Sequence, residues 1–150
     1  MKKLIMFFSG LMFIAFAGYQ ANAQVRKIPA SVTDSFKQKY PAASKVEWKD
    51  QITNFGVSFQ LDSAKCDAKF SNKGQWQETE QNVKKENLPV EVTDGLSKSK
   101  YADWAIKSAI KIDLPGNVTQ YRLRVVKSDI QKKVLTFSNE GRLLKDNSTL

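Results

Sequence analysis

The sequence Phe-Ser-Asn-Lys-Gly at residues 70–74 recurs as Phe-Ser-Asn-Glu-Gly at residues 137–141. The recurrence begins well upstream of each copy. An apolar residue and a proline, with Val-Thr-Asp at the same offset behind them, open residues 28–36 and again residues 88–96. A chain that repeats the same signals in the same order is expected to fold as two copies of one structural unit.

Each copy is predicted to begin with a helix. From Ile28 to Tyr40 apolar residues recur every four positions, which places them along one stripe of a helix. Pro41 cannot continue a helix and biases the residue before it away from helical angles, so this helix is expected to end at Tyr40. The second copy has the same apolar spacing from Leu88 onward, and we expect its helix to end near Tyr101.

After each predicted helix the apolar period changes from about 3.6 residues to two. Such alternation is typical of antiparallel strands with one buried and one exposed face. The side chains predicted on the apolar faces are Val46, Trp48, Phe55, Val57, Phe59, Leu61, Cys66, Ala68 and Phe70 in the first copy, and Ile106, Ile110, Ile112, Tyr121, Leu123 and Val125 in the second. Cys66 is therefore interpreted as a buried apolar residue. Fourth strands are expected at about residues 75–79 and 142–145.

The repeated pentapeptide ends in Gly74 and Gly141, which can take a positive φ in a tight turn without strain. Each copy thus predicts a helix followed by a meander of four short strands. A lone helix on four strands buries only a thin core, so the two copies are expected side by side. We predict one α+β domain over residues 24–150. Its two repeats, about residues 28–87 and 88–150, form an eight-stranded antiparallel sheet with both helices on one face.

Residues 1–23 have the order of a secretory signal peptide. Two lysines precede an apolar run from Leu4 to about Ala17, and Ala21-Asn22-Ala23 supplies a cleavage site. The run is shorter than the ~20 residues that a membrane-spanning helix needs. No cysteine stands at the cleavage site to carry a lipid. We expect cleavage near Ala23, no membrane span afterwards, and a periplasmic or secreted protein.

The residues that common enzyme chemistry needs are missing. The chain has no histidine, one cysteine and no glycine-rich phosphate loop. This composition excludes Ser-His-Asp catalysis, histidine-ligated zinc and an intramolecular disulfide. The S-x-x-K motif at residues 97–100 lacks its companion motifs, and the pair Glu78 and Glu80 is interpreted as solvated surface. We predict no catalytic residue, no cofactor and no metal.

The charge of the chain favours an anionic partner without identifying one. The formal net charge of +9 falls to +7 when Lys2 and Lys3 leave with the signal peptide. Nucleic acid is not expected as a partner, because the protein is predicted to be exported and its lysines are spread along the chain.

The residues after the first helix resemble a known family. Tyr40-Pro41, an alanine pair and Val46-Glu47-Trp48 follow one another as in the PepSY-like, β-lactamase-inhibitor-like family of exported Bacteroidota proteins. The second copy departs from this pattern, because it reads Tyr101-Ala102 where Tyr-Pro would recur. The resemblance implies the fold of the secreted β-lactamase inhibitor proteins and no active site, and fold alone does not assign a function.

The polar sides of the predicted strands make the candidate binding face. They carry Ser58, Gln60, Asp67, Lys69, Arg122, Arg124, Val134 and Thr136. The resemblance implies that such an open sheet face can grip a protein partner. Arginine pairs with carboxylates or phosphates and is enriched where partners bind most strongly. The candidate site residues are Lys69, Arg122, Arg124, Gln60 and Trp76; Trp76 would be an anchor if it were exposed beside Lys69.

Two functions remain open at this point. The first is a non-catalytic periplasmic module that binds a protein partner, for example as an inhibitor or chaperone of an envelope enzyme. The second is a binder of a small or polymeric anionic envelope ligand, such as a glycan or a lipid headgroup, through the cationic sheet face. Binding of an anion should depend on the arginines and weaken steeply with salt, whereas a protein-binding face should resist salt better.

Overall fold

The computed structural model describes residues 27–148. The predicted signal peptide, residues 1–23, and its cleavage site lie outside the described residues. Within residues 27–148, no helix combines the length and the apolar character needed to cross a membrane.

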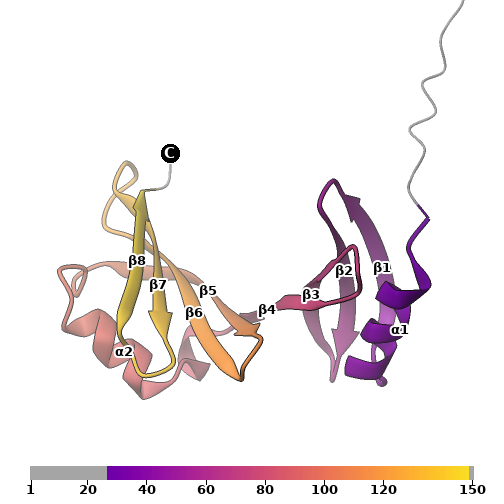
Figure 1. Cartoon of the computed structure of the whole chain (residues 1–150). Coiled ribbons are helices and arrows are strands. Elements are labelled where there is room, and N and C mark those ends of the chain that lie inside the picture. Colours follow the sequence, from indigo (N-terminus) through magenta and orange to yellow (C-terminus); the bar gives the residue numbers. More distant parts are fainter. Residues whose placement is uncertain (1–26, 149–150) are drawn as a thin grey trace, which may run out of the picture.

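The eight strands form one antiparallel sheet in the order β1 to β8, with each strand beside its neighbours in the sequence. The elements are α1 (Ala30–Lys39), β1 (Ser44–Gln51), β2 (Asn54–Leu61), β3 (Ala64–Ser71), β4 (Trp76–Val83), η1 (Lys85–Asn87), α2 (Val90–Ser97), β5 (Ala105–Leu114), β6 (Val118–Val126), β7 (Lys132–Ser138) and β8 (Leu143–Ser148). Figure 1 shows α1 beside β1 to β3 and α2 beside β5 to β8, with β4 running between the two groups. The predicted α+β class, with eight antiparallel strands and two helices, is confirmed.

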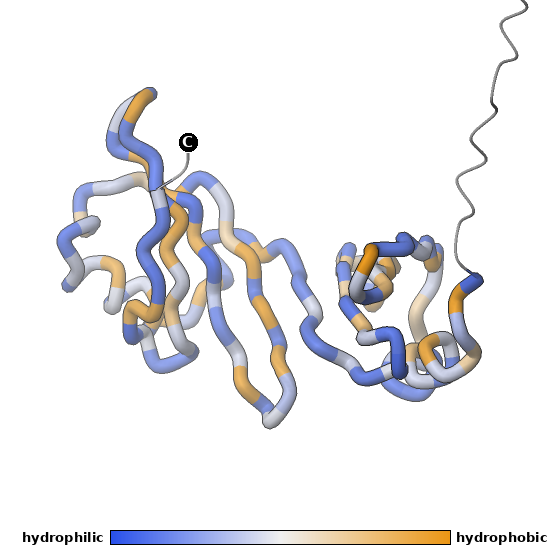
Figure 2. The backbone as a smooth tube through the Cα atoms, turned by 45° about the horizontal axis from the view of Figure 1, so that its top comes forward, coloured by the Kyte–Doolittle hydropathy of each residue, from blue (hydrophilic) through white to orange (hydrophobic). Residues whose placement is uncertain are grey.

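The sheet carries two separate hydrophobic cores on the face that the helices cover. Apolar and polar residues alternate along the strands, as Figure 2 shows, so each strand turns one side toward its helix. In the first half, Val32 and Phe36 of α1 pack onto the sheet; in the second, Val92 and Leu96 of α2 do so. The strand residues buried with them are Phe55, Val57, Phe59, Cys66, Ala68 and Phe70, and Ala109, Tyr121, Leu123, Val125, Leu135 and Phe137.

The repeated pentapeptide forms the turns β3–β4 and β7–β8, and each turn lies against the first turn of a helix. Gly74 and Gly141 have φ of 82° and 80°. A Cβ atom on Gly74 would lie 2.4 Å from the carbonyl oxygen of Ser31, and one on Gly141 would lie 1.9 Å from that of Glu91. Only glycine fits at such distances. The pentapeptide recurs because both helices dock onto the sheet through the same contact.

The second helix ends earlier than expected, at Ser97 and not near Tyr101. The Ser99 hydroxyl donates to the carbonyl oxygen of Leu96 at 2.7 Å and accepts the amide N–H of Tyr101 at 3.1 Å. These bonds satisfy a helix-terminal carbonyl and turn the chain away from the helix axis. Tyr101 is nevertheless buried, and its hydroxyl donates to the Asp146 carboxylate on β8.

Two of the isoleucines predicted to face the helix do not. The register of β5 against β6 shifts between Ile106 and Ser108. Ile106 packs against the second core, whereas Ile110 and Ile112 lie across from Arg122 and Gln120 on the other face of the sheet. One extra residue in a bulge moves every later side chain of a strand to the opposite face, and the strict alternation assumed from the sequence cannot show it.

The remaining core and strand predictions differ less from the structure. Cys66 is buried, as predicted. Trp48 packs edge-on against Phe36 with ring centroids 5.3 Å apart, whereas Val46 on the outer strand is 40% exposed. The fourth strand of each half is longer than expected, since β4 reaches Val83 and β8 reaches Ser148.

Alanine at Gly74 or Gly141 should lower the free energy of unfolding by about 3 kcal/mol or more, because it adds left-handed backbone strain to a collision with the helix. Gly116 is the matched control. Its φ is 78°, but a Cβ atom there would meet nothing within 4 Å. Gly116→Ala should lower the free energy of unfolding only by the left-handed backbone strain, about 1 to 2 kcal/mol. Urea unfolding of the three variants checks this; equal losses at all three positions would contradict the docking contact.

Asp146 should stabilise the fold at neutral pH and stop doing so in acid. The Tyr101 hydroxyl and the ammonium groups of Lys133 and Lys100 hold its pKa at about 2, below the ordinary 3.8. A carboxylate whose folded pKa is depressed stabilises the folded state above its unfolded pKa, and this contribution is lost as pH falls through the folded value. At pH 7 the Asp146→Asn variant should therefore unfold at a lower urea concentration than the wild type.

The difference between the wild type and Asp146→Asn should shrink as pH falls from about 4 to about 2. Asp34→Asn is the control, since Asp34 is exposed on α1 and makes no ion pair within residues 27–148. A wild-type advantage that persists unchanged near pH 2 would contradict the assigned role of Asp146.

Candidate binding surface

One face of the sheet, called here the open face, is covered by neither helix. Both helices and both cores lie on the other face, called here the helix side. The strand register brings onto the open face the side chains of Glu47, Lys49, Gly56, Ser58, Gln60, Lys65, Asp67, Lys69, Glu78, Glu80, Asn82, Ser108, Ile110, Ile112, Gln120, Arg122, Arg124, Val134, Thr136, Lys145 and Asn147. The open face therefore extends over both halves of the molecule.

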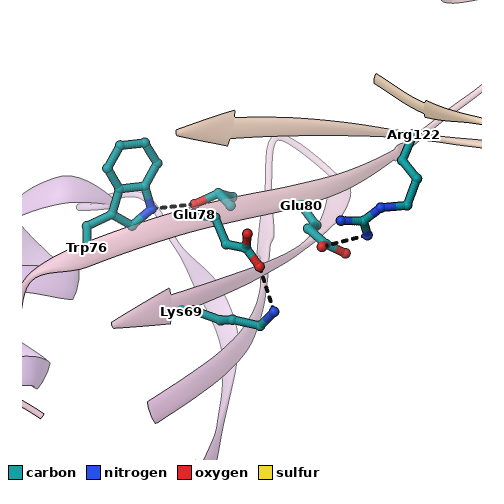
Figure 3. Close-up of polar contacts among 6 residues, drawn as sticks. Lys69, Trp76, Glu78, Glu80 and Arg122 are labelled. Carbon is teal, nitrogen blue, oxygen red and sulfur yellow. Dashed lines mark hydrogen bonds and ion pairs between the residues drawn. The ribbon is translucent and has the colours of Figure 1, made fainter. Parts of the chain in front are cut away.

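Two of the predicted site residues are held in ion pairs on this face. The Lys69 ammonium on β3 lies 2.6 Å from Oε1 of Glu78 on β4. The Arg122 guanidinium on β6 donates through Nη1 to Oε1 of Glu80 on β4 at 2.9 Å. Figure 3 shows both pairs beside each other along β4. Because β5 lies between β4 and β6, the second pair spans a strand and joins the two halves.

The middle of the open face is apolar and well packed. Ile112 on β5 is only 3% exposed although no helix covers it. It lies opposite Glu80 on β4 and opposite Gln120 on β6, so the neighbouring side chains of the open face cover it. Ser58 and Thr136 are buried on the same face, with 7% and 5% exposed. Side chains that are packed and paired in this way lose little conformational entropy when a partner binds.

Arg124 and Gln60 complete the part of the predicted site that the structure brings together. Arg124 is exposed on β6 between Ser108 and Val134 of the adjacent strands, and it makes no ion pair within residues 27–148. Gln60 is half-buried on β2 beside Lys65. The two residues lie in different halves of the open face. Arg124 is thus the one cation of the predicted set that is ready to pair with a partner.

Trp76 lies on the helix side and not beside Lys69. The register of β3 against β4 shifts between Lys69 and Phe70, which pairs Trp76 with Phe70. The Trp76 indole N–H donates to the Thr79 hydroxyl at 2.8 Å, and the ring packs against the first core. Figure 3 shows the ring projecting away from the two ion pairs. Trp76 therefore provides no anchor on the open face.

The acidic partners Glu78 and Glu80 were interpreted from the sequence as solvated surface, yet both take part in the site. Their alternation along one strand does place them on one face. The sequence does not reveal the strand register that places Glu80 near Arg122, because the two residues are 42 positions apart in the chain. That register is set by the pairing of β4 with β5 and of β5 with β6, in which Glu80 lies opposite Ile112 and Arg122 opposite Ile110.

Residues 27–148 offer nothing that resembles a metal or nucleophile centre. No group of three or more His, Cys, Asp or Glu side chains in this part of the chain could hold a metal ion. The Cys66 thiol is buried on the helix side, and burial raises its pKa, which keeps it protonated and unreactive. The arrangement can bind by shape and by charge.

Several solved structures share this fold. A BLIP-like protein from Bacteroides fragilis is 23% identical, with a TM-score of 0.76 over 84% of this chain and 89% of that one. A DUF2874 family protein from Bacteroides ovatus is also 23% identical, with a TM-score of 0.75 over 82% of this chain and 89% of that one. A protein from Bacteroides eggerthii, described as "putative periplasmic", is 18% identical. Its TM-score is 0.73 over 82% of this chain and 90% of that one.

No curated protein matches the chain significantly. The signature of the family described as "Putative beta-lactamase-inhibitor-like, PepSY-like" matches residues 54–145. These residues run from the start of β2 into β8 and include both copies of the pentapeptide. The chain belongs to the PepSY-like, beta-lactamase-inhibitor-like family.

Proposed function

We propose that this protein is a non-catalytic binding module that docks a protein partner on its open face, in the periplasm or outside the cell. The observation that carries the proposal is the layering: within residues 27–148, two helices and two cores share one side of an eight-stranded sheet, and neither helix covers the other side. The family description, which refers to an inhibitor, favours the same class of function.

The composition of the open face suits a protein partner. Ile110 provides a partly exposed apolar side chain near the centre, Ile112 packs beneath the surface beside it, and the paired charges lie on the adjacent strands. Protein interfaces combine an apolar core with a polar rim in this way. Within this face, exposed Arg124 next to Val134 matches the residue type that most often dominates binding energy.

The alternative ligand, a small or polymeric anion, has less support. Of the three cations predicted to hold it, Lys69 pairs with Glu78 and Arg122 pairs with Glu80. An anion would have to compete with a carboxylate at each of these two positions. Arg124 is the one predicted cation that is unpaired within residues 27–148, and the other exposed lysines of this face, Lys49, Lys65 and Lys145, lie apart on β1, β3 and β8, which gives only a diffuse attraction for a phosphate or a polyanion at physiological salt.

The proposed location depends on two observations. Residues 1–23 have the order of a signal peptide, and one protein of the same fold is described as periplasmic. Both favour export of the chain.

Arg124→Glu should abolish capture of a partner while leaving the fold intact, because it reverses an exposed, unpaired charge in the centre of the second half. Residues 24–150 would be immobilised, exposed to a periplasmic extract of the source bacterium at low and at moderate salt, and the bound proteins identified by mass spectrometry. Lys73→Glu is the matched control, since it makes the same charge change in the exposed β3–β4 turn. Arg122→Glu is less suitable, because it would set two carboxylates against each other at Glu80.

The proposal predicts one protein that is retained by the wild type and by Lys73→Glu, survives moderate salt, and is lost with Arg124→Glu. Retention by all three baits would show that the open face is not the docking surface. Retention that disappears for the wild type at moderate salt would favour the anionic ligand.

A further inference from the structure

We propose that the protein also binds a saccharide unit in a pocket on the helix side, where the two halves meet. This pocket, the seam pocket, is lined by Lys39, Tyr40, Trp76, Asp113, Leu114, Gly116, Asn117, Val118 and Thr119 and measures about 380 Å³. Its residues come from the end of α1, the start of β4 and the β5–β6 hairpin. The volume lies in the range of small-molecule sites. The proposal is independent of the open face, which lies on the other side of the sheet.

Trp76 gives the seam pocket an aromatic surface with a fixed orientation. Its indole N–H is already bonded to the Thr79 hydroxyl, which also meets the hydroxyl of Tyr40. The polar edge of the ring is therefore satisfied, and what it offers to the pocket is the ring face. An aromatic face is electron-rich and attracts the weakly positive C–H groups that one side of a sugar ring presents.

Asp113 gives the pocket a fixed hydrogen-bond acceptor. Its Oδ1 accepts from the Thr119 hydroxyl at 2.9 Å, and its Oδ2 accepts from the Lys111 ammonium at 3.0 Å. A carboxylate has about four acceptor positions, so two donors hold it in place and leave capacity for ligand hydroxyls. The carboxylate is also partly exposed, at 38%.

Lys39 gives the pocket a mobile donor. Its ammonium lies 3.5 Å from the centroid of the Trp76 ring and makes no ion pair within residues 27–148. A cation–π contact at an exposed site is weak, so the side chain can move from the ring to a ligand oxygen at small cost. The ring face is then free for the sugar.

The balance of charges distinguishes between ligand classes. A plain anion would meet the Asp113 carboxylate, and a plain cation would meet the Lys39 ammonium. A wholly apolar ligand would remove water from the Asp113 carboxylate and the Lys39 ammonium and offer no hydrogen bond in its place. A neutral ring with hydroxyl groups satisfies all three features at once: the aromatic face, the acceptor and the donor.

Titration of ¹⁵N-labelled residues 24–150 with cellobiose, maltose and N,N′-diacetylchitobiose, followed by NMR, tests the proposal. At least one disaccharide should shift the indole N–H of Trp76 and the amides of Asn117 and Thr119 saturably, with a Kd in the millimolar range or below. The indole signals of Trp48 and Trp104 should stay in place. Tetramethylammonium and acetate serve as probes that carry charge alone and should cause no saturable shift there.

Asp113→Ala should weaken the binding about tenfold or more, because it removes a charged hydrogen-bond acceptor. Asp129→Ala, which makes the same change in the exposed β6–β7 turn, should leave it unchanged. Asn117→Gly keeps the positive φ of that turn residue and tests the pocket without touching Asp113; it should weaken binding severalfold. The proposal is overturned if all three disaccharides fail to shift the pocket signals, if the shifts lie elsewhere, or if acetate or tetramethylammonium binds there equally well.

Discussion

The contact between a turn glycine and the first turn of a helix determines how each half of the molecule is built. At Gly74 and Gly141 the backbone of the turn approaches a helix carbonyl so closely that no side chain fits between them. This contact holds α1 and α2 on the same side of the sheet. The stripe of apolar residues on each helix then covers the apolar sides of its strands, and the other face of the sheet receives no cover. The open face is thus a consequence of where the helices dock.

The contacts that join the two halves of the molecule are less extensive than the packing within each half. Five residues of β4, from Thr79 to Val83, pair with β5, and the two cores do not merge. On the open face, the Arg122–Glu80 pair adds a link across β5. On the helix side, polar residues such as Thr79 and Asp113 occupy the boundary, and the seam pocket lies there. A boundary made by backbone pairing and polar contacts is where a ligand or a partner can reach both halves at once.

The sequence is sufficient to predict the architecture because the signals that determine it are local. Four-residue spacing marks the helices, two-residue spacing marks most strands, and Gly74 with Gly141 marks equivalent turns. The failures arise where a bulge changes the register. A shift after Ile106 turns Ile110 and Ile112 to the open face, and a shift after Lys69 turns Trp76 to the helix side. In β5 the even spacing of Ile106, Ile110 and Ile112 continues through the bulge, so the apolar alternation does not reveal it.

The prediction of the binding site is limited in the same way, because the sequence does not show the strand register. Lys69, Arg122, Arg124 and Gln60 share a face because strand alternation alone places them there. Their electrostatic states depend on strand register and could not be predicted: Lys69 and Arg122 are paired with glutamates, and Arg124 is unpaired within residues 27–148. The residue expected to bind a partner most strongly is therefore Arg124, beside the apolar part of the open face, and not a group of three cations.

Site-specific photocrosslinking in living cells of the source organism tests most directly whether the open face binds a partner. A photoreactive amino acid would replace Lys145 on the open face or, as the control, Glu91 on the exposed surface of α2. The account predicts a discrete crosslinked protein from position 145 and none from position 91. A crosslink from position 91 alone would place the partner on the helix side and contradict the account.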